Sequence, residues 1–417
     1  MNAYRKNINM LNEWLFSSGI HYLDKKNNLD AFYGDYNKNN NSYSFIYCEI
    51  TGYAINYFLN LYKLEQEKKY LEVAKRAGYF ILTKQYQEND LKGSMPWSID
   101  RNGRPHYLYY SFDTSMCLSS LVDLYNMTED NRFLKAAVMA ADWLMEMAQN
   151  YDGSFKAVYN SNKRLFDENI LRETWSGDGG CLHIKHLMGL LKVYKVTKFE
   201  KYIESINKLL EWSLKMQKDN GSFKATAYSP LTFTHSHCYA TEGIIYAFNY
   251  FREPILERLI LNSAQWLLKV QNQDGSYYDY YNLADMLTRF IQTKNILPRL
   301  RSGFFNIDSN AIIKIKRTDA TSQAARIMLF VYLLIGDERY KKAAINAIKF
   351  VNKMQSANFN KAEQSAVCFG LLDFRGIRRK SRLYTSWSSM FAVNAMQLFT
   401  QINNKTIDID TFVEELF

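Results

Sequence analysis

Four acidic residues stand in short polar segments, and a long apolar stretch follows each of these segments. Glu49, Asp113 and Asp319 occupy comparable places in their segments, and Asp178 lies in a Gly-Asp-Gly-Gly sequence. Carboxyl groups that converge in a partly closed pocket shift one another's pKa, so that one stays protonated as an acid while another serves as a base. We therefore predict that Asp113 is the principal acid/base residue and that Glu49, Asp178 and Asp319 assist it.

Each of these acids also has a simpler explanation. An acidic residue at the start of a helix accepts a backbone N–H and interacts favourably with the helix dipole. That role accounts for Asp113 or Asp319 taken alone, but it does not require acids to recur beside tryptophan, histidine and tyrosine. The distances between carboxyl groups decide between the two interpretations, because an enzyme that hydrolyses a glycosidic bond holds its two carboxyl groups about 5–10 Å apart.

Two histidines, His235 and His237, are separated by one residue and precede Glu242. A metal site is one interpretation, but this spacing suits a loop or strand better than a helix face, and neither Cys nor Asp completes a recognised ligand set. We predict no metal ion and no cofactor. We expect His237 to transfer a proton or to hydrogen-bond the substrate. His235, Tyr239 and Glu242 are predicted to bind the substrate.

Aromatic residues recur near the same polar segments. Trp97, Trp175 and Trp387 stand apart from the other four tryptophans, and Tyr47 lies two residues before the first of the acids. Their rings can stack on sugar rings, so we predict that they bind a carbohydrate. Arg317, or alternatively the basic run at 375–382, is predicted to neutralise a substrate carboxylate, because guanidinium groups form strong paired hydrogen bonds with carboxylates.

The elements that position these residues follow from an internal repeat. A large apolar residue is followed ten residues later by an aromatic one in six places, as in Tyr340 and Phe350. The other pairs are Tyr70 with Phe80, Phe133 with Trp143, Tyr202 with Trp212, Leu256 with Trp266, and Tyr4 with Trp14. Five copies continue to a glutamine, and three of these lead into an Asp-Gly-Ser or Asn-Gly-Ser turn, which is typical of a helix end.

More apolar segments lie between the copies, and we expect buried helices there, at about 47–62, 112–126, 180–195, 237–250, 318–335 and 385–400. Alternation of six amphipathic and six buried helices predicts an all-α fold, an (α/α)6 toroid of six helical hairpins in one domain, 1–417. The loops that enter the buried helices are the long ones, so the starts of these helices should face one cavity. The longest loop, 276–317, is predicted to be a lid.

Composition excludes several classes of protein. The chain has 417 residues, of which 47% are hydrophobic, and only 5 Pro and 18 Gly, which argues against a β-sandwich. The net charge is +10, but the basic residues gather only in the 375–382 segment, so we predict no nucleic-acid partner. Five widely spaced cysteines suggest reduced thiols. With no apolar stretch long enough to span a membrane, the sequence predicts a cytoplasmic protein.

The segments Tyr47-x-Glu49-Ile-Thr-Gly-Tyr, Phe112-Asp113-Thr, His235-x-His237-x-Tyr239-Ala-x-Glu242-Gly and Thr318-Asp319-Ala-Thr, with the Gln…Asp-Gly-Ser turns, resemble a known family. It is the six-hairpin glycosidase-like toroid superfamily, in particular the toroid proteins associated with polysaccharide biosynthesis. The superfamily includes unsaturated glucuronyl hydrolases, 2-epimerases of acylated glucosamine and some polysaccharide lyases. The resemblance implies catalytic acids or histidines at the starts of the inner helices.

The hypothesis that we favour is a cytoplasmic carbohydrate-active enzyme that hydrolyses an acidic or polysaccharide-derived sugar by carboxylate acid/base catalysis. A polysaccharide lyase or sugar epimerase is an alternative, in which His237 or a tyrosine removes a proton from carbon. A non-catalytic glycan-binding protein of polysaccharide biosynthesis is another alternative. Polar helix starts and the missing Asp-x-Asp-Asp motif disfavour isoprenoid chemistry. The sugar, the linkage and the oligomeric state are not predicted by the sequence.

Overall fold

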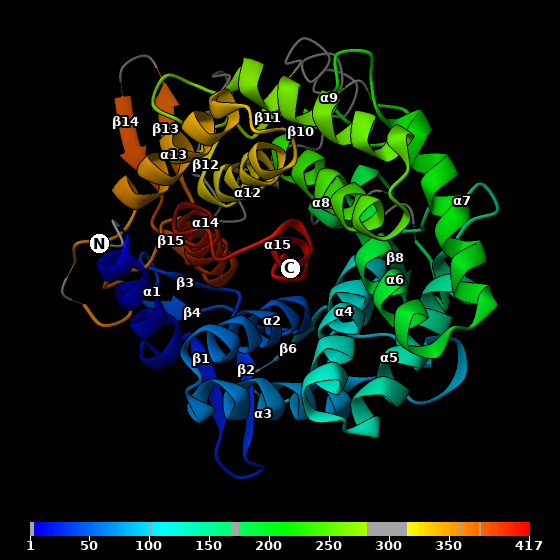
Figure 1. The fold of residues 1–417 in the computed structure, drawn as a ribbon. Helices are drawn as coiled ribbons and strands as arrows, with labels where there is room; N and C mark the ends of the chain where they lie inside the picture. Colours follow the sequence, from blue (N-terminus) through cyan, green and yellow to red (C-terminus); the bar gives the residue numbers. More distant parts are fainter. Residues whose placement is uncertain are drawn as a thin grey trace.

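In the computed structural model, helical hairpins close into a ring with one helix of each pair inside and the other outside (Figure 1). The structure describes residues 4–100, 102–167, 175–177, 179–229, 231–281, 315–358, 360–374 and 377–417. The inner helices are α2 (Cys48–Glu65), α4 (Ser111–Thr128), α6 (His186–Thr197), α8 (Thr234–Phe251), α12 (Thr318–Ile335) and α14 (Ser386–Asn404). The outer helices are α1 (Arg5–Ser17), α3 (Lys68–Lys84), α5 (Asn131–Trp143), α7 (Glu200–Met216), α9 (Pro254–Val270) and α13 (Glu338–Lys353). Each inner helix packs on the next, and α14 closes the ring against α2.

The predicted all-α toroid is confirmed, and every expected apolar segment contains an inner helix. Two boundaries differ from the prediction. The third segment begins as a short 3-10 turn, η5 (Cys181–Lys185), before α6. The fourth helix, α8, begins at Thr234 rather than near 237, so that His235 and His237 are both helical. Their positions therefore follow helical rather than extended geometry, which the sequence interpretation did not expect.

The two kinds of helix differ in burial because they occupy different layers. The outer helix α7 buries one stripe, which includes Tyr202, Leu209 and Trp212, and exposes its charged face. The inner helices are buried over most of their length, and they end in residues with left-handed backbone conformation. These end residues are Gln66, Glu129, Lys198, Arg252, Gly336 and Lys405. A left-handed residue stops the helix and turns the chain at once, which keeps these hinges short.

The repeated glutamines join neighbouring outer helices. The Gln149 side chain donates to the carbonyl oxygens of Gly153 (3.3 Å) and Ser205 (3.0 Å), and it accepts from the Ser205 hydroxyl (2.7 Å). Equivalent side-chain amide bonds run from Gln85 to Ala136 and from Gln271 to Ala343. The repeat that the sequence displays is therefore a cross-link between successive hairpins.

Loss of one cross-link is expected to destabilise the ring measurably. Gln149→Ala removes three hydrogen bonds and leaves the Ser205 hydroxyl without the acceptor that Gln149 provides, so we expect the free energy of unfolding to fall by about 2 kcal/mol. Urea denaturation followed by circular dichroism measures this loss. Gln87→Ala, at an exposed glutamine, is the control and should change the free energy by less than about 0.5 kcal/mol.

Short strands, which the sequence did not predict, lie where the chain enters the inner helices. Five of them run directly into an inner helix: β5 (Ile46–Tyr47), β7 (Leu108–Tyr110), β10 (Thr232–Phe233), β12 (Ile315–Arg317) and β15 (Leu383–Thr385). They pair with β6 (Ser98–Ile99), β8 (Val158–Asn160), β11 (Tyr280–Tyr281), β13 (Gly370–Phe374) and β3 (Asp35–Asn37). A third strand extends three of these sheets: β9 (Leu165–Phe166) pairs with β8, β14 (Ile377–Lys380) with β13, and β4 (Ser42–Tyr43) with β3. Separately, β1 (His21–Asp24) pairs with β2 (Leu29–Phe32). The ladders are antiparallel and set the direction in which each inner helix begins.

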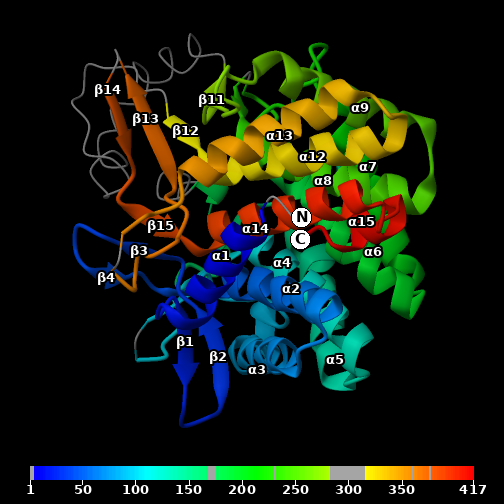
Figure 2. The same cartoon turned by 60° about the vertical axis from the view of Figure 1, so that its left-hand side comes forward.

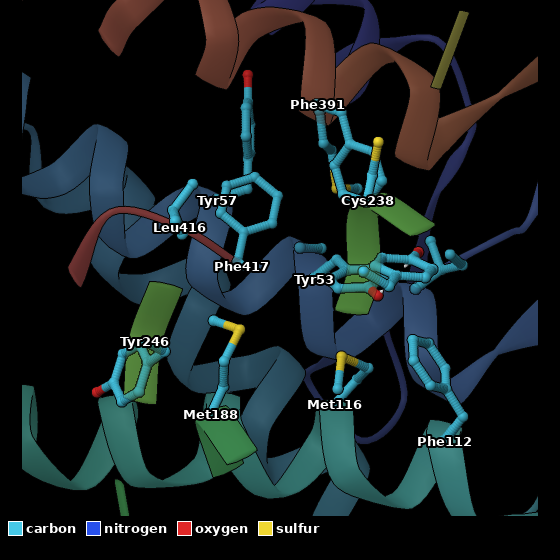
Figure 3. Close-up of a cluster of buried hydrophobic side chains, with 14 of the residues drawn as sticks. Tyr53, Tyr57, Phe112, Met116, Met188, Cys238, Tyr246, Phe391, Leu416 and Phe417 are labelled. Carbon is cyan, nitrogen blue, oxygen red and sulfur yellow. Dashed lines mark hydrogen bonds between the residues drawn. The ribbon is translucent and has the colours of Figure 1, made fainter. Parts of the chain in front are cut away.

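The C-terminal segment lies at the other end of the ring. Helix α15 (Ile409–Glu414) sits inside the ring of helices, and Figure 2 shows it at the side opposite the strands. Beyond it, Phe417 lies among the buried side chains of the inner helices (Figure 3), with its ring centre 6.1 Å from that of Tyr53 and 5.9 Å from that of Phe391. This segment fills the centre of the toroid at the end where the inner helices finish.

Two sequence predictions concern parts of the chain that the structure does not cover fully. Most of the predicted lid, 276–317, falls in 282–314 and lies outside the described residues. Among the helices of the described ranges, none is both long and apolar enough to cross a membrane.

Candidate functional site

The strand end of the ring brings together side chains from the first turns of several inner helices. Glu49 on α2, Asp113 on α4, His235 on α8 and Asp319 on α12 are each at most 2% exposed. Four different strands enter these helices, so residues far apart in the sequence arrive at one end of the toroid. Trp387, at the start of α14, is partly exposed and hydrogen-bonds to Asp319.

Glu49 and Asp113 form a pair of buried carboxyl groups. Neither oxygen of Asp113 accepts a hydrogen bond from a donor among the described residues, and the neighbouring ionisable group is Glu49. The hydroxyl groups of Tyr47 and Tyr53 lie close enough to Glu49 to stabilise its ionised form. A buried polar atom without a donor is costly, so two acids in contact are stable only when they share a proton.

The protonation of this pair follows from its surroundings. Burial raises the pKa of Glu49 to about 7, although Tyr47, Asp113 and Lys185 oppose the change. Burial and then the Glu49 charge raise the pKa of Asp113 well above its usual value. Asp113 is therefore the proton donor of the pair at neutral pH, and Glu49 is the member that ionises first. A carboxyl group with a pKa near 7 can both give and take a proton under physiological conditions.

Asp319, in contrast, is held as a carboxylate. Arg317 donates from Nε to Asp319 Oδ1 (2.9 Å) and from Nη2 to Oδ2, and the Trp387 indole donates to Oδ2 (2.9 Å). The backbone N–H of Ala320 also donates to Oδ1 (2.7 Å). Burial acts to raise the pKa of Asp319, but the charge of Arg317 outweighs it and lowers the pKa below the usual range. Asp319 is thus a poor proton carrier, and we do not retain it as a partner in acid/base chemistry.

The role predicted for Arg317 also changes. Besides Asp319, its guanidinium binds Asp279 through Nη1 (3.2 Å) and stacks over the Phe369 ring at 4.7 Å. Two carboxylates of the chain therefore already neutralise the guanidinium that the sequence assigned to a substrate carboxylate. Asp279 lies within the predicted lid, 276–317, and the sequence analysis assigned it no role of its own.

His235 is a neutral imidazole with a defined tautomer. Its Nδ1 lies 2.6 Å from Gln323 Oε1, and the amide nitrogen of Gln323 donates to Glu242, which orients the amide. Because an amide oxygen only accepts, Nδ1 carries the hydrogen and Nε2 keeps a lone pair. Burial lowers the pKa of His235 to about 3. The Tyr239 ring packs against the imidazole at 4.4 Å.

His237 lies elsewhere, because two residues on a helix are about 200° apart around the axis. It therefore faces the outer layer when His235 faces the ring centre. Its Nδ1 accepts from the backbone N–H of Phe223 (3.1 Å), and its Nε2 bonds the Ser263 hydroxyl (2.9 Å). The Trp266 ring packs edge-on against the His237 imidazole, with ring centres 4.5 Å apart. Both nitrogens are occupied in a structural contact, so we do not retain His237 as a catalytic candidate.

Glu242 belongs to a buried ion cluster. Lys185 binds its Oε2 (2.8 Å), Arg326 binds its Oε1 (2.5 Å), and Gln323 donates to Oε2 (3.4 Å). Lys185 also donates to the Phe417 backbone oxygen (2.9 Å). Burial lowers the pKa of Lys185 to about 8. The sequence interpretation missed Lys185 and Arg326, although a charged residue inside an apolar inner segment is a usable signal.

The predicted aromatic residues lie in different surroundings. Trp97 is partly exposed and packs with Phe45 at 4.9 Å and Tyr47 at 6.5 Å, beside the carboxyl pair. Tyr239 hydrogen-bonds Tyr53 through its hydroxyl (3.0 Å) and is buried rather than at the rim. Two further predictions, Asp178 and the side chain of Trp175, lie outside the described residues. Within the described ranges, no three His, Cys, Asp or Glu side chains gather in a way that could hold a metal ion.

Solved structures with the same architecture cover nearly the whole chain. No family model and no curated protein sequence matches it. The structure of a cellobiose 2-epimerase from Bacillus thermoamylovorans is similar, with a TM-score of 0.72, 15% identity, and coverage of 95% of this chain and 100% of that one. A sugar epimerase from a ruminal bacterium has a TM-score of 0.71 and 15% identity, covering 96% and 99%. An unsaturated glucuronyl hydrolase from Streptococcus agalactiae has a TM-score of 0.61 and 16% identity, covering 94% and 90%.

These identities are low, so the similarity establishes the toroid fold rather than the reaction. The neighbours include sugar epimerases and glucuronyl hydrolases, and glucuronyl hydrolases are among the toroid enzymes that the sequence resemblance implies. An association with polysaccharide biosynthesis stays a prediction.

Proposed function

We propose that the protein is a carbohydrate-active enzyme that hydrolyses a glycosidic bond of a polysaccharide-derived sugar, with Asp113 and Glu49 as one proton-exchanging unit. The observation that carries this proposal is the Asp113 carboxyl, which is buried and has no donor among the described residues. A buried carboxyl that accepts from no donor calls for an explanation, and a substrate hydroxyl would supply that donor. Fold neighbours that act on sugars support the same class of substrate.

The roles of the two acids differ from those first expected. A glycosidase of the usual kind places one carboxyl on each side of the scissile bond. Glu49 and Asp113 lie against each other, so they would act from one side. Asp113 would donate its proton to the leaving oxygen, and the ionised pair would then take a proton from the attacking water. Tyr47 and Trp97, packed beside the pair, are suited to contact the sugar ring.

A substrate panel tests this function. Wild-type protein is incubated with neutral and uronate-bearing disaccharides, and the products are separated and weighed by mass spectrometry. We expect at least one member to be split with the addition of water, and Glu49→Gln to lower its kcat by about 10²-fold or more. Asp142→Asn, in the outer ion pair with Lys201, is the control and should keep kcat. Full activity of Glu49→Gln would contradict the assignment.

Epimerisation is the second candidate, because His235 keeps an Nε2 lone pair that can accept a proton from carbon. In that reaction the substrate keeps its mass in ordinary water and gains one deuterium in heavy water. We expect His235→Asn to lower the rate of deuterium incorporation by about 10²-fold or more if this reaction operates. Deuterium incorporation that persists in His235→Asn, or splitting of the substrate without incorporation, would exclude this role for His235.

A further inference from the structure

Three buried cations, Arg317, Lys185 and Arg326, are bound to acids of the chain. Arg317 is held between Asp319, through two donors, and Asp279 at 3.2 Å. The positive charge that sequence analysis expected to face a substrate carboxylate is therefore matched by two negative charges within the protein. Because burial is almost complete, with Arg317 8% exposed and Asp279 9%, water screens this arrangement little.

The second group of cations is occupied in the same way. Lys185 and Arg326 both bind Glu242, and Lys185 is further fixed by the Phe417 backbone oxygen. Neither cation forms an ion pair with Glu49 or Asp113 among the contacts of the described residues. Three cations thus face three carboxylates, and the Glu49 and Asp113 pair adds further negative charge when it ionises.

We propose that this site takes an uncharged sugar and discriminates against a uronate, an inference that rests on the proposed function and specifies its substrate class. A uronate would bring another negative charge into a buried cluster that has no unmatched cation among the described residues, which is unfavourable. A neutral sugar would instead donate its hydroxyl groups to Asp113 and stack on Tyr47 and Trp97. The preference for a neutral sugar over a uronate then arises because Asp279 and Asp319 already neutralise Arg317.

The overall positive charge of the protein does not alter this inference. The basic residues that the structure describes in the 375–382 segment lie on or just after strand β14, where Arg378, Arg379 and Lys380 are exposed. Among the ion pairs of the described residues, none joins Arg378, Arg379 or Lys380 to Asp319, Asp279 or Glu49. The charged surface strand and the charge-balanced interior are separate features, and the interior one includes Arg317 and Asp319 at the start of α12.

A matched pair of ligands tests the inference. Isothermal titration calorimetry compares cellobiose with the disaccharide in which its non-reducing glucose is replaced by glucuronic acid. We expect the wild type to bind the neutral disaccharide at least about tenfold more tightly. Equal or tighter binding of the uronate would overturn the inference. Because binding needs no turnover, a sugar that binds but is neither split nor epimerised would count against the proposed function alone.

A variant tests the cause of the preference. Asp279→Asn removes one negative charge from Arg317 and frees its Nη1 group, so the ratio of uronate to neutral affinity should rise about fivefold or more. Asp142→Asn makes the same change of charge on the outer helices and should leave the ratio unchanged. Circular dichroism confirms that both variants fold. An unchanged ratio in folded Asp279→Asn would contradict the assigned role of Arg317.

Discussion

Asp113→Asn is expected to lower kcat by about 10²- to 10⁴-fold and at the same time to make the protein more stable at neutral pH. Asparagine has nearly the same shape as aspartate and can still donate a hydrogen bond to Glu49, but it cannot transfer a proton to a leaving oxygen. It also removes a buried carboxyl that has no donor of its own among the described residues. The two effects, loss of activity and gain of stability, are separate consequences of one feature.

The pH dependence of stability gives this prediction its sign. Burial raises the pKa of Asp113 above the value of an unfolded aspartate, so the folded state binds more protons. The contribution of such a group to the free energy of unfolding is fully present below about pH 4, the pKa of an unfolded aspartate. This contribution is lost as the pH rises toward the pKa of the group in the folded state. The wild type should therefore become progressively less stable than Asp113→Asn between about pH 4 and pH 8.

Urea denaturation of both proteins across this pH range measures the difference in the free energy of unfolding, and effects of the buried histidines cancel because both proteins share them. Asp142→Asn, at an outer ion pair, should show no gain that grows with pH. Retained activity in Asp113→Asn would refute the catalytic assignment. A loss of stability at neutral pH would show instead that Asp113 has a structural partner.

Gly153→Ala is expected to cost more than about 4 kcal/mol of folding stability or to prevent folding. Gly153 has a φ of +90°, and a Cβ built on it would lie 2.0 Å from the Lys208 carbonyl oxygen of the next outer helix. Backbone atoms of a packed helix cannot yield by the distance required. Soluble yield and urea denaturation measure the effect, and binding of a sugar should fall only as far as folding does.

A second glycine distinguishes the cost of the steric contact from the cost of the left-handed backbone conformation. Gly336 also has a positive φ, of +73°, but a Cβ there would meet nothing within 4 Å. Gly336→Ala is therefore expected to cost only about 1 kcal/mol, since only the conformational penalty remains. Similar losses for the two variants would mean that the close approach between hairpins is not what requires glycine at Gly153.

Much of the fold was readable from local patterns. Aromatic residues ten apart, such as Tyr202 and Trp212, lie on one face of an outer helix because that spacing is close to three helical turns. In another copy of the repeat, the glutamine and glycine that follow the outer helix, Gln149 and Gly153, mark the turn that contacts the next hairpin. Such features repeat because each hairpin packs against its neighbours in the same way, and a repeat can be recognised from the sequence alone.

For the candidate site, the sequence predicted some of the residues but not the partners that each of them contacts. Polar residues at the starts of apolar segments identified Glu49, Asp113, His235 and Asp319, since every inner helix begins at the same end of the ring. Which partner each would meet depends on rotation about a helix axis and on neighbouring hairpins. For that reason His237, two residues from His235, was assigned to the centre but packs against the outer helix α9.

Composition and periodicity in the chain were sufficient for the toroid, the order of its helices and the end at which polar groups collect, because these depend on local spacing. Tertiary packing alone decided the protonation of those groups. It set Asp113 beside another acid and Asp319 beside Arg317, so that burial keeps the first protonated while an adjacent cation keeps the second ionised. Charge in a buried site depends on distances between residues that are remote in sequence, and such distances exist only in the folded chain.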